Sequence, residues 1–199
     1  MSNIAIVEKT NSDISLKYIL AVLNSKLLSY YFVKNTAKSV RKLFPKIILN
    51  DLRKFPIKKI KPEFQEPFIE KADSILALNK ELQEQSQKFQ RTIQRKFNLE
   101  DLPKKLQDWY LLTYSEFIKE LAKKKVKLSL SEEAEWEDYF ETESKKAQDL
   151  KAQIDKTDKE IDQMVYELYG LSEEEIKYFL DDKEEEQEGQ RWWRRFWLK

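Results

Sequence analysis

Two stretches of the chain place apolar residues at alternating steps of three and four positions, and this pattern restricts the fold more than any other. The first stretch has the spacing 4-3-4-3-4-3-4 and consists of Phe68, Ala72, Ile75, Asn79, Leu82, Ser86, Phe89 and Ile93. The second has the spacing 3-4-3-4-3-4 and consists of Ala147, Leu150, Ile154, Thr157, Ile161, Met164 and Leu168. Heptad spacing of this kind predicts two long helices that each bury a narrow seam. The polar residues Asn79 and Ser86 weaken the first seam and can fix its register.

The simplest arrangement of these two helices is an antiparallel coiled-coil hairpin over residues 64–97 and 144–169, because connected elements tend to return to each other. A dimer that forms through each helix separately is the alternative. Residues 98–142 lie between the two helices and are predicted to be a small helical insert.

The insert has apolar residues of its own and also residues that can begin helices. Pro103 stands at a predicted helix N-terminus, and Ser129 or Ser131 can cap the helix that carries Trp136. The side chains of Trp109 and Trp136 are interpreted as core anchors rather than as ligand contacts.

Residues 1–61 have a different pattern, typical of a small α+β fold. Short β-like runs at 4–7, 47–49 and 55–57 are the predicted strands. One helix is predicted from about Leu16 to Val33, with Ser12 or Asp13 as its cap. The basic stretch from Lys34 to Lys46 is predicted to be a loop. Three short strands and one helix make a thin core, so the rest of this domain is expected to be missing or to lie on another chain.

The C-terminal part predicts a helix end, a short helix and a tail. Gly170 is a predicted left-handed C-cap, and Ser172 with Glu175 forms a capping box that opens a helix to about Leu180. The tail over residues 181–199 is acidic and then rich in Trp and Arg, and it is expected to be disordered. A membrane-binding or nucleic-acid-binding tail, a docking peptide and a segment with no evolved role are its alternatives.

The composition removes several classes of chemistry. The chain has no histidine and no cysteine, which excludes catalytic triads, zinc hydrolases and thiol catalysis. It has only two glycines, so a glycine-rich phosphate loop is excluded as well. Asp155, Asp158 and Asp162 share a helix face that could attract a cation, but the lysines among them favour a solvated face. No catalytic and no metal-binding residue is therefore predicted.

No apolar run approaches the roughly 20 residues that a membrane helix needs, and the first ten residues do not follow the pattern of a signal peptide. A cytoplasmic location and no membrane partner are therefore expected.

The net charge of +1 conceals an asymmetry between the two ends of the chain. Residues 1–62 carry 13 Lys and Arg against three acids, and residues 63–199 carry 24 against 33. An anionic partner at the basic end is one explanation, and two surfaces that merely differ in charge are the other. Arg and Lys bind phosphates, and Arg and Asn can also read base edges. The candidate DNA-binding residues are Lys34, Asn35, Lys38, Ser39, Arg41, Lys42, Lys46, Arg53 and Lys54.

Four motifs, in this order, resemble a known family. They are LNSKL at 23–27, LRKFPI at 52–57, FQEPFI at 64–69 and EIDQMVYELYGLSEEEI at 160–176. Together they are similar to the TaqI-like C-terminal specificity domain of adenine-specific DNA methyltransferases and to the target-recognition modules of type I specificity subunits.

This resemblance implies a mainly α chain that binds double-stranded DNA. A partial α+β target-recognition domain (1–61) is followed by a helical spacer (62–180), made of the antiparallel coiled-coil hairpin with its small insert. In the family, a methyltransferase domain or partner subunit flips the adenine and binds S-adenosylmethionine, so no cofactor is expected on this chain. The chain lacks that catalytic region and is expected to be a C-terminal fragment or a subunit.

The predicted function is target recognition in a restriction–modification system, which positions the methyltransferase or a linked endonuclease on its site. A coiled-coil assembly protein that does not bind DNA is the alternative. Whether the chain is part of an enzyme stays open, because the sequence presents no catalytic constellation.

Overall fold

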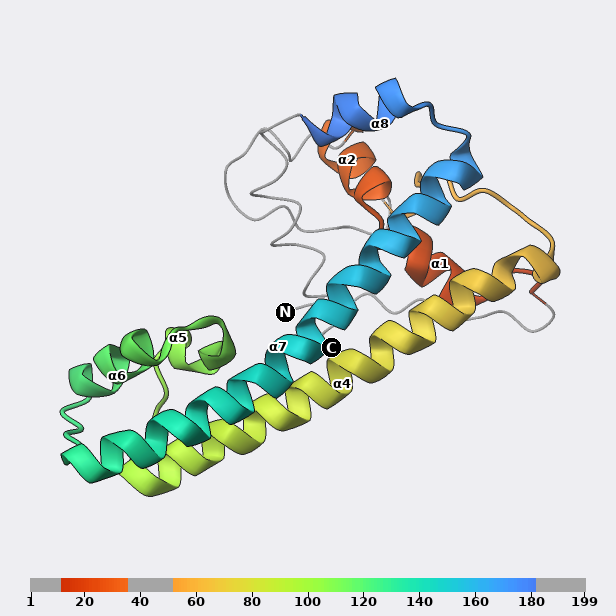
Figure 1. Cartoon of the computed structure of the whole chain (residues 1–199). Coiled ribbons are helices and arrows are strands. Elements are labelled where there is room, and N and C mark those ends of the chain that lie inside the picture. Colours follow the sequence, from red (N-terminus) through yellow and green to blue (C-terminus); the bar gives the residue numbers. More distant parts are fainter. Residues whose placement is uncertain (1–11, 36–51, 182–199) are drawn as a thin grey trace. The chain divides into compact units, whose positions relative to one another are not determined.

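The computed structural model describes residues 12–35 and 52–181, and these residues are mainly α-helical. Figure 1 shows the helices in chain order. The chain divides into two compact units: Met1–Leu76 with Lys156–Lys199 form the first, and Ala77–Asp155 form the second. The three-part division drawn from the sequence, at residues 61 and 180, therefore stays a prediction.

The helix predicted from Leu16 to Val33 is in fact two helices, α1 (Leu16–Leu23) and α2 (Lys26–Asn35). The predicted cap is also wrong, because the Ser15 hydroxyl accepts the hydrogen bond from the Lys17 N–H. The break occurs at Ser25, whose hydroxyl donates to the Val22 carbonyl at 2.7 Å and accepts from the Leu28 N–H at 3.4 Å. A serine that bonds to the backbone in this way ends one helix and begins the next.

The strand predicted at 55–57 is wrong, since the described residues 53–61 contain only a turn and irregular backbone. Their carbonyl groups accept hydrogen bonds from side chains of other elements and not from a neighbouring strand. The strands predicted at 4–7 and 47–49 lie outside the described residues.

The core of the first unit forms where α1 and α2 meet the first turns of α4 (Pro62–Phe97) and the last turns of α7 (Leu130–Tyr169). The Tyr18 and Phe68 rings meet edge to face, with their centroids 5.3 Å apart. In the same unit, the Lys71 ammonium donates to the Glu160 carboxylate at 2.6 Å and lowers its pKa. This contact joins α4 to α7.

The two heptad seams are buried as their spacing predicts, with one shift. All eight residues of the first seam are buried on α4. In the second seam Met164 and Leu168 are only half-buried, while Val165 is fully buried. The shift follows from the surroundings of the end of α7, which packs against α1, α2 and α8 as well as against α4.

The helix that carries Trp136 and the second heptad helix are one helix, so no break in secondary structure marks the predicted insert boundary at 142. α7 begins at Leu130, where the Ser129 hydroxyl and the Glu132 carboxylate form reciprocal capping bonds. Between 130 and 169 the sequence has no Gly and no Pro, and nothing there ends a helix.

The second unit encloses an aromatic core between α4, α7 and the short elements α5 (Lys104–Gln107), η1 (Trp109–Leu111) and α6 (Tyr114–Lys123). Trp109 is fully buried and stacks on Phe89, with 3.7 Å between ring centroids. Trp136 is buried as well. The prediction that these two tryptophans anchor a core is therefore confirmed.

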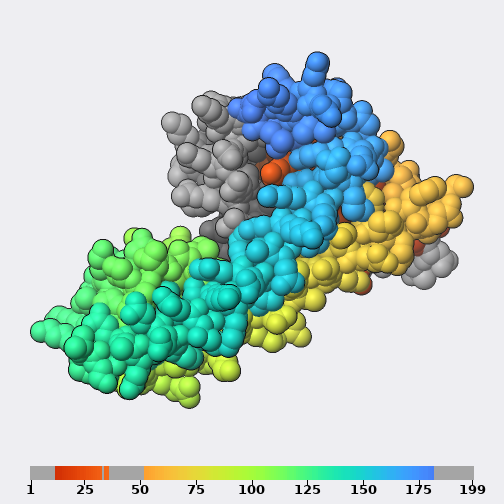
Figure 2. All heavy atoms as spheres, in the orientation of Figure 1, coloured from red at the N-terminus to blue at the C-terminus, as the bar shows by residue number. Residues whose placement is uncertain are grey.

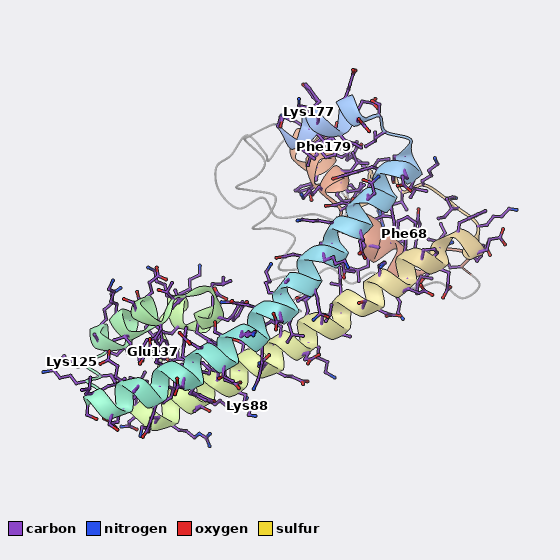
Figure 3. The ribbon with its side chains drawn as sticks, in the orientation of Figure 1. Phe68, Lys88, Lys125, Glu137, Lys177 and Phe179 are labelled. Carbon is purple, nitrogen blue, oxygen red and sulfur yellow. The ribbon has the colours of Figure 1, made fainter. Side chains whose placement is uncertain are left out.

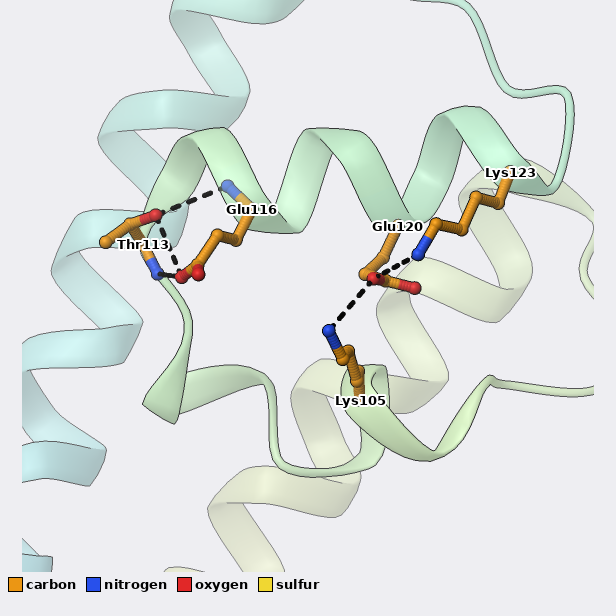
Figure 4. A network of polar contacts seen from close by, with 5 residues as sticks. All are labelled: Lys105, Thr113, Glu116, Glu120 and Lys123. Carbon is orange, nitrogen blue, oxygen red and sulfur yellow. Dashed lines mark hydrogen bonds and ion pairs between the residues drawn. The ribbon is translucent and has the colours of Figure 1, made fainter.

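Polar contacts join the short helices of the second unit (Figure 4). Thr113 and Glu116 form the capping box that begins α6. The Glu120 carboxylate on α6 accepts from Lys123 at 2.7 Å and forms an ion pair with Lys105 of α5 at 3.7 Å. The hydrogen bond from Lys123 lowers the pKa of Glu120.

The predicted end of α7 and start of α8 (Glu173–Leu180) are confirmed. Gly170 has a φ of +71°, and Ser172 with Glu175 forms the capping box. Phe179 is buried against Tyr166 of α7 and Tyr30 of α2, and Figure 3 shows it at the α2 side of α8. In the space-filling view the atoms of α8 lie on those of the end of α7 (Figure 2).

Within residues 12–35 and 52–181, no helix is both long and apolar enough to cross a membrane.

Candidate nucleic-acid interface

Four of the nine residues predicted to contact DNA lie in the described part of the chain. Lys34 and Asn35 end α2, and Arg53 and Lys54 form the turn that follows Leu52; the side chains of all four are exposed. The other five lie outside the described residues: Lys38, Ser39, Arg41, Lys42 and Lys46. The predicted loop is wrong for its first two residues, because α2 continues to Asn35, whose amide donates to the Tyr31 carbonyl at 2.9 Å.

Aromatic contacts bring the end of α2 against the turn at 52–55. The rings of Tyr31 and Phe32 lie 6.1 and 5.9 Å from that of Phe55, centroid to centroid. The Tyr31 hydroxyl also donates to the Lys54 carbonyl at 3.4 Å. The two pairs of predicted residues, one on α2 and one on the turn, therefore lie on neighbouring parts of the first unit.

A cation–π contact organises the last turn of α2. The Lys34 ammonium lies 5.6 Å from the centroid of the Tyr30 ring, one helical turn earlier. Tyr30 in turn packs against Phe179 of α8. The aromatic cluster thereby supports a cationic side chain at the surface.

Residues 53–61, named here the basic strap, connect this turn to α4. The strap contains five bases and no acid, and all five are exposed: Arg53, Lys54, Lys58, Lys59 and Lys61. Three of its apolar side chains belong instead to the core of the first unit: Phe55, Ile57 and Ile60. The strap therefore turns its apolar side chains inward and its charges outward.

Tyrosine hydroxyls hold the backbone of the strap. The Tyr169 hydroxyl donates to the Pro56 carbonyl at 2.5 Å and accepts from the Lys58 N–H at 3.3 Å. The Tyr18 hydroxyl donates to the Lys58 carbonyl at 2.6 Å. Burial raises the pKa of Tyr18 to about 12 and also raises that of Tyr169, so both hydroxyls remain donors to a higher pH than an exposed tyrosine would.

Gln65 of α4 fixes the far end of the strap. Its buried side-chain amide donates to the carbonyls of Ile60 and Asp13, at 3.0 and 2.7 Å, and accepts from the Ser15 N–H at 2.8 Å. One side chain thus ties the strap to the segment that begins α1.

The Lys58 ammonium donates to the Leu168 carbonyl at 2.7 Å, in the last turn of α7. Terminal carbonyls of a helix have no partner within it, and a cation there also interacts favourably with the negative end of the helix dipole. Lys58 therefore contributes to the structure of the first unit as well as to its charge.

The prediction that Asp162 lies on a solvated face is wrong, because Asp162 is buried beneath the start of α2. Its carboxylate accepts from the Lys26 N–H at 2.8 Å. No cluster of three or more potential metal-ligating side chains occurs in the described ranges.

Lys58, Lys59 and Lys61 also belong to the basic surface, although they are not among the predicted DNA-binding residues. The pattern that identifies them is the run of bases without an acid, interrupted by apolar residues, from Arg53 to Lys61. The positions of Gln65 and Tyr169 have no such local pattern, because their partners are far away in the sequence.

Comparison with known families gives two matches. The family model of the TaqI-like C-terminal specificity domain matches residues 1–57, which confirms the resemblance over that segment. A domain of unknown function, DUF8810, matches residues 61–165, more than half of the chain. No curated protein and no solved structure matches.

Proposed function

We propose that this chain, which belongs to the DUF8810 family of domains of unknown function, is the DNA-binding target-recognition component of a restriction–modification system. It positions an adenine-specific DNA methyltransferase, or a linked endonuclease, on its site. The match to the TaqI-like specificity domain over residues 1–57 supports the role in restriction and modification.

One observation carries the proposal: the contact of Tyr31 and Phe32 with Phe55. It brings Lys34 and the pair Arg53 and Lys54 to neighbouring positions inside the segment that matches the specificity domain. Exposed Lys and Arg side chains bind DNA phosphates, and an Arg can also bond two acceptors of guanine. The predicted residues between 38 and 46 belong to the same proposed interface.

α4 and α7 are proposed to act as the spacer, arranged as an antiparallel coiled-coil hairpin. Residues of both seams share one hydrophobic cluster in each unit. Ion pairs link the two helices in each unit as well: Lys71 with Glu160 in the first, and Lys96 with Glu132 in the second. Both observations favour pairing within one chain over a dimer through each helix separately.

The chemistry of methylation is assigned to the methyltransferase region or subunit, which binds S-adenosylmethionine. This chain's part is to bind double-stranded DNA and to hold that region at a set distance from the target. The proposed setting is the cytoplasm, without a membrane partner.

The test measures the binding of the purified full chain to a labelled DNA duplex by fluorescence anisotropy, over a series of salt concentrations. Arg53→Ala with Lys54→Ala should weaken binding about tenfold or more, and should reduce the slope of log K against log salt by about 2. The matched control is Lys145→Ala with Lys159→Ala. These substitutions remove the same charge as the Arg53 and Lys54 variant, but from exposed lysines in an acidic stretch of α7.

Binding that ignores salt, or that both double variants weaken equally, would contradict the proposal. A methyltransferase subunit captured by a chain that does not bind DNA would favour the coiled-coil assembly protein instead.

A further inference from the structure

We infer that the basic strap is itself a binding ridge for the DNA backbone, in which Lys59 and Lys61 contact phosphates while Tyr18, Tyr169 and Lys58 hold the strap in place. This inference rests on the proposed function. It extends the interface beyond the predicted residues and past residue 57, where the match to the specificity domain ends.

Side chains from several helices hold the backbone of the strap. Its carbonyls at 54, 56, 58 and 60 each accept a hydrogen bond from a side chain. The donors belong to four different helices: Tyr31 on α2, Tyr169 on α7, Tyr18 on α1 and Gln65 on α4. Five like charges on nine residues repel one another, so these tethers keep a strongly cationic segment in one conformation.

The lysines of the strap have different partners. The Lys58 ammonium donates to the Leu168 carbonyl and so belongs to the tethers. The Lys61 ammonium lies 3.7 Å from the Glu63 carboxylate, and the two side chains are 76% and 66% exposed. A pair this exposed contributes little to stability, so a phosphate can replace the carboxylate at small cost. The Lys59 side chain is exposed.

The shape and charge of the strap fit a polyanion with a regular backbone. Residues 56–61 in extended form reach at most about 20 Å, the axial length of about six phosphates on one DNA strand. Lysine ammonium groups bind phosphates as flexible point charges and lack the planar fork that reads a base. The ridge therefore adds affinity and fixes orientation without selecting a sequence.

The first experiment repeats the anisotropy titration with Lys59→Ala and Lys61→Ala together. We expect about tenfold weaker binding at low salt and a slope smaller by about 2, equally on duplexes of different sequence. The control is again Lys145→Ala with Lys159→Ala. If Arg53→Ala with Lys54→Ala weakens binding and the Lys59 and Lys61 variant does not, the inference fails while the proposed function stands. If the wild-type chain binds no DNA, both fail.

The second experiment tests the tethers with Tyr169→Phe, which removes one hydroxyl and no charge. We expect three- to tenfold weaker DNA binding with the wild-type salt slope, and faster native-state cleavage by trypsin after Lys58 and Lys59. Tyr178→Phe is the control, because Tyr178 is 71% exposed on α8. Wild-type affinity together with wild-type cleavage would overturn the role of Tyr169.

An acidic protein segment is the competing ligand for such a ridge. Polyglutamate, added to the labelled duplex in the same titration, distinguishes the two. The inference predicts that the wild-type chain prefers the duplex at equal charge concentration. A preference for polyglutamate that Lys59→Ala with Lys61→Ala removes would assign the ridge to a protein partner and would overturn the inference.

Discussion

The carboxylate of Asp162 on α7 accepts a hydrogen bond of 2.8 Å from the backbone N–H of Lys26, the first residue of α2, across 136 residues of sequence. The first N–H groups of a helix have no partner within it, and a carboxylate there also complements the positive end of the helix dipole. The end of α7 therefore supplies a cap that α2 does not contain locally. The Lys26 ammonium lies at 4.0 Å from the same carboxylate.

Asp162 should make the stability of the first unit depend on pH. Burial raises the pKa of its carboxyl to about 6, against the opposing effect of the Lys26 N–H. In the unfolded chain the pKa is about 3.9. At pH values between these two pKa values, Asp162 is mostly protonated in the folded state and mostly ionised in the unfolded state. The stabilisation from protonated Asp162 is thus complete below about pH 4 and lost as the pH rises to about 6.

Asp162→Asn isolates this dependence, because the amide keeps an acceptor oxygen and cannot titrate. Between pH 4 and pH 7, the free energy of unfolding of the wild type should fall relative to that of the variant by about 2 kcal/mol. Urea unfolding at a series of pH values measures the difference, and carboxylates common to both proteins cancel. A constant difference across this range would contradict the prediction.

Gln65→Leu should destabilise the first unit by about 2–4 kcal/mol. The substitution keeps a side chain of similar length but leaves two carbonyls and one N–H without their bonds: those of Asp13, Ile60 and Ser15. A fully buried unsatisfied group costs about 1–3 kcal/mol, and these three groups are only partly buried, so each should cost about 1 kcal/mol. Gln83→Leu, at an exposed position on α4, is the control and should change the free energy of unfolding by less than about 0.5 kcal/mol.

The features of the fold that sequence predicts well are the local ones. The first seam, the end of α7 at Gly170 and the capping box at Ser172 each depend on residues within a few turns of one another. The break at Ser25 escapes prediction because α1 and α2 contribute to the same core, so the apolar spacing continues across it.

The candidate interface has the same limit, because only those features that depend on residues close in sequence can be predicted. Charge and the run of bases predict that Arg53 and Lys54 lie at a basic surface. The irregular backbone that presents them is stabilised by Tyr18, Tyr169 and Gln65, whose partners are distant in sequence. For the same reason Asp162 resembles a surface acid when only its own helix is considered.

Ser86 is a polar residue in the first seam, and its side chain is a hydrogen-bond partner of the buried Trp109. The Trp109 indole N–H donates to the Ser86 hydroxyl at 3.2 Å inside the core of the second unit. Ser86→Ala should cost about 1–2 kcal/mol, since it leaves that N–H buried without an acceptor. The double variant Ser86→Ala with Trp109→Phe should cost less than the sum of the two single changes, because the phenyl ring has no N–H to satisfy. Chemical denaturation of the four proteins completes the cycle, and strict additivity would show that the hydrogen bond does not matter.

Gly170 provides a separate test of backbone strain at the junction of α7 and α8. Its φ of +71° is costly for residues with a side chain, yet a Cβ at this position meets no atom within 4 Å. Gly170→Ala should therefore cost about 1 kcal/mol through conformation alone, and Gly170→Asn should cost less, because Asn tolerates the left-handed region. The N–H groups of Gly170 and Leu171 donate to the carbonyls of Glu167 and Tyr166, both at 3.0 Å, and each variant can keep these bonds. Urea midpoints with unchanged m-values measure both costs. An Asn variant as unstable as the Ala variant would show that steric contact, and not φ, determines the choice of glycine here.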